Sequence, residues 1–224
     1  MKKLYFTTAT IIIALCATLF LSNTENPSAT TPSAQQNKAP RQSKKTGKIL
    51  VAYFTCPESD GIDAASGASR IIVNGKLYGN TEHVARTIAD AVGGELFAIQ
   101  TVKTYPAAHQ MLIDDAKREA EANARPALAT HIDRPDNYDI IFVGYPNWWY
   151  DMPMPLYTFF DEYDFSGKTI IPFCTHGGSR FSQSVKTIAE LEKDARVIQG
   201  SAISRDNVAE TQTIITNWLQ KQNF

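Results

Sequence analysis

The stretch Gly79-Asn80-Thr81-Glu82-His83-Val84-Ala85 opens a helical pattern whose apolar residues recur three to four positions apart as far as Val92. Upstream, residues 49–55 form an apolar run that predicts a buried strand. A strand, then Gly, Asn and Thr, then a helix can cradle an anion, because free backbone N–H groups and the positive end of the helix dipole favour phosphate. Thr55 and Thr81 add hydroxyls. The alternative is an ordinary strand–loop–helix connection with Thr81 as the N-cap.

Two later strand-like runs also end in loops that suit a ligand. Residues 140–145 are continuously apolar, as is typical of a buried parallel strand, and Pro146-Asn147-Trp148-Trp149-Tyr150 follows. Clustered aromatics at the carboxyl end of a strand suit a flat aromatic ligand, although core packing or a protein-contact surface is the alternative. Residues 169–175 form another such run, which ends in Thr175-His176-Gly177-Gly178. The glycines let the backbone approach a ligand closely, or they form a plain turn.

Strand patterns alternate with helical patterns after residue 47, which predicts an α/β fold with a doubly wound parallel sheet. Strands are expected near residues 48–55, 95–101, 139–145, 169–175 and 195–201, and later helices near 107–124, 156–163, 181–191 and 208–219. Ligands of open α/β sheets bind beyond the carboxyl ends of the strands. The three loops are therefore predicted to lie at one edge of the sheet.

Together the three loops resemble those of the flavodoxin family, in particular a bacterial branch with Gly-Asn-Thr, Pro-x-Trp-Trp and Thr-His-Gly-Gly-Ser loops. The resemblance covers roughly Lys48 to Lys221. It implies a five-stranded parallel sheet of order 2-1-3-4-5 and an FMN cofactor, with the phosphate on the first loop and the isoalloxazine ring between the other two. The residues implied in cofactor binding are Thr55, Cys56, Gly79, Asn80, Thr81, Pro146, Asn147, Trp148, Trp149, Tyr150, Thr175, His176, Gly177 and Gly178.

Two features depart from the flavodoxin pattern. Residues 57–78 intervene in what is usually a short phosphate loop, and Arg180 stands where a small residue is expected. Within the insertion, Asn74-Gly75 predicts a hairpin with a type I′ turn. The hairpin would serve as a packing flap, or it would present Lys76 or Tyr78 to the phosphate.

The resemblance favours an FMN-binding electron carrier. The alternatives are an FMN-dependent NAD(P)H quinone or nitro-compound reductase, with His176 as a candidate proton donor, and a binding module without flavin. The sequence has no strand–Gly-x-Gly-x-x-Gly–helix unit for a nicotinamide cofactor, and it predicts no catalytic residue and no metal site. Because adjacent residues in an extended loop point opposite ways, one of Trp148 and Trp149 is expected to pack on the ring. Asn147 is expected to adopt a positive φ beside them.

The N-terminal residues have the pattern of an export leader. Lys2 and Lys3 precede an apolar stretch, so residues 1–21 are expected to be a signal peptide or a membrane anchor. Residues 22–47 are rich in Ser, Thr, Pro, Ala, Gln and Asn and are expected to be a flexible linker. Either arrangement places the domain of residues 48–224 outside the cytoplasm, in the periplasm or anchored to the outer face of the cytoplasmic membrane.

Charge separates the leader from the domain. Residues 1–46 hold six Lys/Arg and one acidic residue, which leaves 16 basic and 22 acidic residues in the rest of the chain, a net charge of −6. An acidic surface argues against nucleic acid and suits a monomer that docks on the basic face of a redox partner protein.

The cysteines of the domain are Cys56 and Cys174, which end strands two positions apart in the expected order. At about 4.8 Å per strand step they would lie about 9.5 Å apart, whereas a disulfide needs Cα atoms within about 7 Å. The sequence therefore predicts two thiols near the flavin rather than a disulfide.

Overall fold

The computed structural model describes residues 47–57 and 70–222. The predicted leader, nearly all of the predicted linker and the middle of the 57–78 insertion lie outside the described residues. Within the described residues, no helix combines the length and the apolar character needed to cross a membrane.

The core of the domain is a parallel sheet. When its strands are numbered along the chain, they lie side by side in the order 2-1-3-4-5. The order is β4-β1-β5-β6-β7, with β8 also paired to β6. The predicted fold class and strand order are therefore confirmed. The strands are β1 (Ile49–Tyr53), β4 (Glu95–Ala98), β5 (Ile140–Pro146), β6 (Thr169–His176), β7 (Arg196–Val197) and β8 (Ala202–Ser204).

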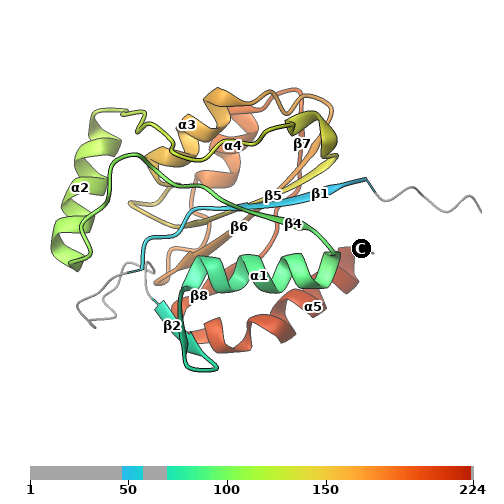
Figure 1. The fold of residues 1–224 in the computed structure, drawn as a ribbon, viewed down its shortest axis with the longest axis horizontal. Helices are drawn as coiled ribbons and strands as arrows, with labels where there is room; N and C mark the ends of the chain where they lie inside the picture. Colours follow the sequence, from blue (N-terminus) through green and yellow to red (C-terminus); the bar gives the residue numbers. More distant parts are fainter. Residues whose placement is uncertain (1–46, 58–69, 223–224) are drawn as a thin grey trace, which may run out of the picture. The chain divides into compact units, whose positions relative to one another are not determined.

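Helices cover both faces of this sheet (Figure 1). On one face lie α1 (Asn80–Val92) and α5 (Thr211–Gln222), and on the other α3 (Met154–Glu162) and α4 (Ser184–Leu191). Side chains of β1 alternate between the two apolar layers: Leu50 and Ala52 pack with α3 and α4, whereas Val51 and Tyr53 pack with α1 and α5. Burial on both faces explains why the strands read as continuous apolar runs rather than alternating ones. Short 3₁₀ helices complete the chain at η1 (Pro135–Asn137) and η2 (Arg205–Glu210).

The fifth strand is divided into β7 and β8, whereas one strand over residues 195–201 was expected. Residues 196–202 oppose residues 169–174 of β6, so the fifth strand holds one extra residue, as at a β-bulge. The Gly200 N–H still donates to the Pro172 carbonyl oxygen at 3.0 Å. Pro172 has no N–H to return to this strand, which removes a ladder bond at the interruption.

The Asn74-Gly75 hairpin forms as predicted, from β2 (Arg70–Val73) and β3 (Lys76–Gly79). Asn74 has φ 50° and Gly75 has φ 76°, the two positive angles that a type I′ turn requires. The Tyr78 ring lies 4.9 Å from the Lys76 ammonium and 5.4 Å from the Arg86 guanidinium carbon of α1. The Arg86 contact places Tyr78 of the hairpin against α1, in agreement with a packing flap.

Helix α2 (His109–Glu121) does not cover a face of the sheet. It lies beyond the carboxyl ends of the central strands, at the left of Figure 1. Its buried residues Leu112 and Ala116 pack in the same apolar layer as α3 and α4. Helix α2 is therefore placed to form a wall of any pocket at this edge of the sheet.

Candidate functional site

The amino end of α1 has the features of an anion site. Gly79 is the N-cap, and within the described residues no side chain caps the helix. Asn80 and Thr81 form its first turn and are only 3% and 2% exposed. Among the described residues, the buried Oδ1 of Asn80 has no hydrogen-bond partner. A polar ligand could bind here, because the first-turn amides are uncapped, the helix dipole favours negative charge and a buried amide oxygen is unpaired. Thr81 lies inside the helix, so the alternative in which it is the N-cap is wrong.

Residues distant in sequence meet at this helix end. The Thr81 hydroxyl is hydrogen-bonded to the Thr175 hydroxyl of β6 at 2.8 Å, and both are buried. A Cβ added at Gly79 would come within 2.1 Å of Thr55 Oγ1. The absence of a side chain at Gly79 is thus what lets the Thr55 hydroxyl lie against the start of α1. Three of the predicted phosphate-binding residues are brought together, and Thr175 joins them.

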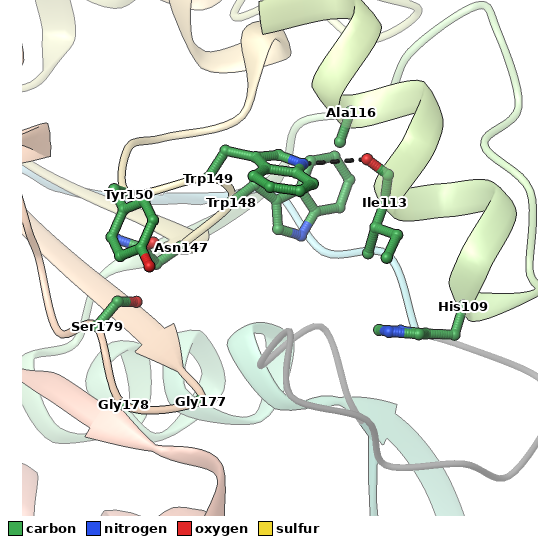
Figure 2. Close-up of a pocket in the computed structure, with 10 residues that line it drawn as sticks. All are labelled: His109, Ile113, Ala116, Asn147, Trp148, Trp149, Tyr150, Gly177, Gly178 and Ser179. Carbon is green, nitrogen blue, oxygen red and sulfur yellow. Dashed lines mark hydrogen bonds between the residues drawn. The ribbon is translucent and has the colours of Figure 1, made fainter.

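A cavity of about 590 Å³ lies beside this cradle and contains most of the predicted ring-binding residues (Figure 2). Its size is in the range of small-molecule and cofactor sites. One side carries the aromatic loop, the opposite side carries the glycines that follow β6, and α2 forms the third wall. The lining residues are His109, Ile113, Ala116, Asn147, Trp148, Trp149, Tyr150, Gly177, Gly178 and Ser179.

The two adjacent tryptophans have different environments. Trp148 is 7% exposed, and its ring contacts Phe54 and Tyr105 edge-on, with centroid distances of 5.5 and 5.6 Å. Trp149 is 47% exposed, and its indole N–H donates to the Ile113 carbonyl oxygen of α2 at 3.0 Å. The Lys117 ammonium lies 5.5 Å from the Trp149 ring centroid. Trp148 therefore belongs mainly to the core beneath the cavity, whereas Trp149 is an accessible wall.

The aromatic loop turns sharply at its centre. Trp149 has φ 53° and Tyr150 has φ 68°, and Trp148 pairs with Asp151 across them as in a two-residue hairpin. Such angles are uncommon for bulky residues. Asn147 does not have a positive φ, so the expectation for it is wrong. Asn147 is instead held in an extended connection, with its N–H on the Thr175 carbonyl and its side-chain amide on the Arg180 carbonyl at 2.9 Å.

The loop after β6 is rigidified by its histidine. His176 Nδ1 accepts a hydrogen bond from the Gly178 N–H at 3.0 Å, and the ring also bonds to the main chain of Ala202. Burial and the nearby Arg180 charge lower the pKa of His176, and the Ala202 bond only partly offsets them. The imidazole is thus neutral at pH 7 and is held by the backbone, which argues against a proton-donor role. Arg180, which stands where the flavodoxin pattern has a small residue, has φ 55°, a conformation that glycine adopts more readily than other residues.

The remaining predicted residues lie at the margins of the site. Pro146 ends β5 and is buried, and Tyr150 is a 68% exposed residue of the rim. Cys56 packs against the apolar layer that contains Phe54, and Cys174 is buried in β6, where burial raises the pKa of its thiol. No disulfide joins Cys56 and Cys174 in the part of the chain described. Neither thiol lines the cavity.

Sequence reasoning missed the wall that α2 supplies. His109, Ile113 and Ala116 recur at intervals of four and three residues, so they share one face of the helix. The helix itself was expected at residues 107–124. Its apolar periodicity, however, is the same for a helix that packs on a sheet and for one that packs against a ligand, and so it could not identify the cavity.

Comparison with known proteins gives a consistent result. A family model described as Flavodoxin matches residues 70–222. A crystal structure provisionally described as a flavoprotein, from Bacteroides eggerthii, has a TM-score of 0.61 and 26% identity and covers 79% of this chain and 98% of its own. A second, from Bacteroides uniformis, has a TM-score of 0.59 and 29% identity over 77% of this chain and 99% of its own. A Lactobacillus acidophilus flavoprotein solved in complex with FMN has the same fold, with a TM-score of 0.53 and 21% identity over 73% of this chain and 97% of its own. No curated protein matches the chain.

Proposed function

Because the chain belongs to the flavodoxin family, we propose that it binds FMN and transfers electrons between redox partners outside the cytoplasm. The observation that carries the proposal is the continuity of two sites. An uncapped helix end with Thr81 and Thr175 lies next to an aromatic-walled cavity, and the segment from Thr175 to Gly178 joins them. A phosphate tail and a flat ring on one ligand match these two parts.

The residues present fit this cofactor. The first-turn amides of α1 and the Thr81 hydroxyl would hold the phosphate without a cationic side chain. The unpaired Asn80 oxygen would accept a ribityl hydroxyl. Trp149 and Gly177 to Ser179 would flank the ring. When bound, FMN supplies the electron-transfer chemistry, while the protein orients the ring and limits its contact with water.

Thr81 tests the cofactor assignment. Replacing Thr81 with Val keeps the shape and removes the hydroxyl, and a lost hydrogen bond to a charged group costs about 1.5–3 kcal/mol, or about ten- to a hundredfold in affinity. Titration of the apo-protein should show this loss for FMN and almost none for riboflavin, which has no phosphate. Thr175→Val should cause a similar loss, and the double variant should lose less than the sum, because the two hydroxyls act as a pair.

Thr87→Val is the matched control. Its hydroxyl donates to the His83 carbonyl within the same helix, one turn or more from the amino end. It should bind FMN as the wild type does. Equal affinity of Thr81→Val and the wild type for FMN would contradict the phosphate assignment, and failure of the wild type to bind FMN would contradict the cofactor itself.

The state of His176 favours the carrier over a reductase. In the reductase this imidazole would be the proton donor, but it is neutral and is hydrogen-bonded to the main chain. The acidic domain would dock on a basic partner. Electron transfer from the reduced protein to a basic redox protein should therefore slow as salt rises, since exposed charges are screened beyond about 10 Å at 0.1 M. Stopped-flow rates across a salt series measure this. A salt-independent rate would remove the docking argument, and sustained NAD(P)H oxidation with a quinone would favour the reductase.

The location outside the cytoplasm rests on the sequence of residues 1–47 alone. Lys2 and Lys3 followed by an apolar stretch are typical of an export leader. Fractionation of bacteria that express the full chain should place it in the periplasmic or membrane fraction. Recovery with cytoplasmic marker proteins would overturn this part of the proposal.

A further inference from the structure

Asp151 does not line the cavity, yet it closes the turn that carries two of the lining residues. Its main-chain N–H donates to the Trp148 carbonyl oxygen at 3.1 Å, and its own carbonyl accepts from the Trp148 N–H at 2.9 Å. Trp149 and Tyr150 form the tip between these two bonds. The tip faces the cavity, with Trp149 toward α2 and Tyr150 toward Ser179 (Figure 2).

The carboxylate of Asp151 joins the turn to the neighbouring helices. Oδ1 accepts from the Met152 N–H at 2.8 Å. Oδ2 accepts from the Tyr157 hydroxyl of α3 at 2.9 Å, from the Gln183 side-chain amide at 3.0 Å and, more weakly, from the Thr187 hydroxyl of α4 at 3.4 Å. Burial and the Asp151 carboxylate raise the pKa of Tyr157 to about 12, so this phenol remains a donor at neutral pH.

The turn needs such anchors because the positive φ angles of its two central residues are unfavourable conformations. Bulky residues with positive φ persist where surrounding contacts determine the conformation, and here both central residues are aromatic. Two further bonds hold the tip from outside: the Gln183 main-chain N–H donates to the Tyr150 carbonyl at 3.3 Å, and the Trp149 indole donates to α2. Asp151 connects the turn to both α3 and α4.

We propose that Asp151 is a positioning residue of the flavin site, which fixes Trp149 and Tyr150 at the cavity through its bonds to α3 and α4. This inference rests on the proposed FMN function. Its effect is on the ring side of the site, whereas Thr81 and Thr175 act on the phosphate side. Variants of Asp151 should therefore weaken the binding of FMN and riboflavin alike, whereas variants of Thr81 and Thr175 should weaken the binding of FMN only.

The test is Asp151→Asn, which keeps the side-chain volume but replaces one acceptor oxygen with an N–H donor that faces other donors. We expect affinity to fall by about tenfold for FMN and by the same factor for riboflavin. Loss of a hydrogen bond to the carboxylate destabilises the anchored turn by an energy of this order, which lowers the population of the binding-competent conformation. We also expect iodide to quench Trp149 fluorescence more strongly in the apo-protein, with Trp149→Phe variants identifying its share of the signal. Gln183→Ala, which removes one anchor only, should show the same changes at smaller size.

Asp114→Asn is the control, because it removes one negative charge from α2, where Asp114 accepts only from Gln110 in the same helix among the hydrogen bonds described. It should leave both affinities unchanged. The proposal would be overturned if Asp151→Asn and Gln183→Ala bound both flavins with the affinity of the wild type. It would also be overturned if these variants lost affinity for FMN alone. If the wild type binds no flavin, the proposed function fails, and unchanged iodide quenching of Trp149 in the apo-protein would separately overturn the anchoring role.

Discussion

Replacing Trp148 with alanine should destabilise the folded domain by about 3–5 kcal/mol, the usual cost of deleting a buried tryptophan. Its ring is buried against Phe54 and Tyr105, and the three rings pack edge to face with one another. Urea denaturation of the apo-protein measures the change. A loss below about 1 kcal/mol, typical of surface substitutions, would show that Trp148 is not a core residue.

Trp149→Ala is the companion variant and should behave in the opposite way. Because Trp149 is half-exposed, its loss should change folding stability little, but it removes the accessible wall of the cavity. A stacked apolar wall disfavours added negative charge on a reduced ring, so its removal should shift the second reduction potential of bound flavin to less negative values. Spectroelectrochemistry of the loaded protein measures the potential, with Trp218→Phe on α5 as a control. Equal potentials in Trp149→Ala and the wild type would rule out stacking by this residue.

Glu192 makes the stability of the domain depend on pH in an unusual direction. It is 8% exposed at the end of α4, where burial and, to a smaller extent, Asp164 and Asp161 raise its pKa from 4.5 to about 7, although the Phe165 N–H bonds to it. Between pH 4.5 and 7 the folded state therefore binds a proton that the unfolded state has lost. The contribution of Glu192 to the free energy of unfolding is fully present below pH 4.5. It is lost as the pH rises through 7, and the free energy of unfolding then falls by about 3 kcal/mol.

Glu192→Gln should remove this dependence, because an amide oxygen can still accept from the Phe165 N–H and carries no charge. The variant should match the wild type at pH 4.5 and exceed its free energy of unfolding by about 3 kcal/mol at pH 8. Denaturation series at several pH values measure the difference. Glu190→Gln, an exposed position on the same helix, should show no such trend. A difference between Glu192→Gln and the wild type that is constant with pH would contradict the assigned titration.

The sequence was sufficient for the sheet and for the edge at which the three predicted loops meet. Buried parallel strands carry a strong signal, since residues 140–145 and 170–174 are apolar throughout, and the Asn74-Gly75 turn is determined by local chemistry. The interruption of the fifth strand was less visible. The missing N–H of Pro172, which lies opposite the interruption, belongs to the neighbouring strand and has an effect only once the two strands are paired.

The sequence predicted two of the loops that line the cavity, whereas the arrangement of their side chains depended on tertiary contacts. Sequence reasoning required that Trp148 and Trp149 differ but could not say which is buried, because the answer depends on Phe54 and Tyr105, which are distant in the chain. Asn147 has the local preference for positive φ, but its amide is committed to the Arg180 carbonyl and the turn falls instead on Trp149 and Tyr150. A contact across the fold thus overrides a residue preference.

The divided fifth strand also bears on how the protein behaves at high concentration. An edge strand exposes a row of N–H and C=O groups on which another chain can build, and long flat edges promote aggregation. Here that edge consists of a two-residue and a three-residue piece separated by a bulge. A bulge twists the edge and breaks the regular repeat of its bonding groups. The irregularity opposite Pro172 therefore makes this edge of the sheet a poor template for strand addition.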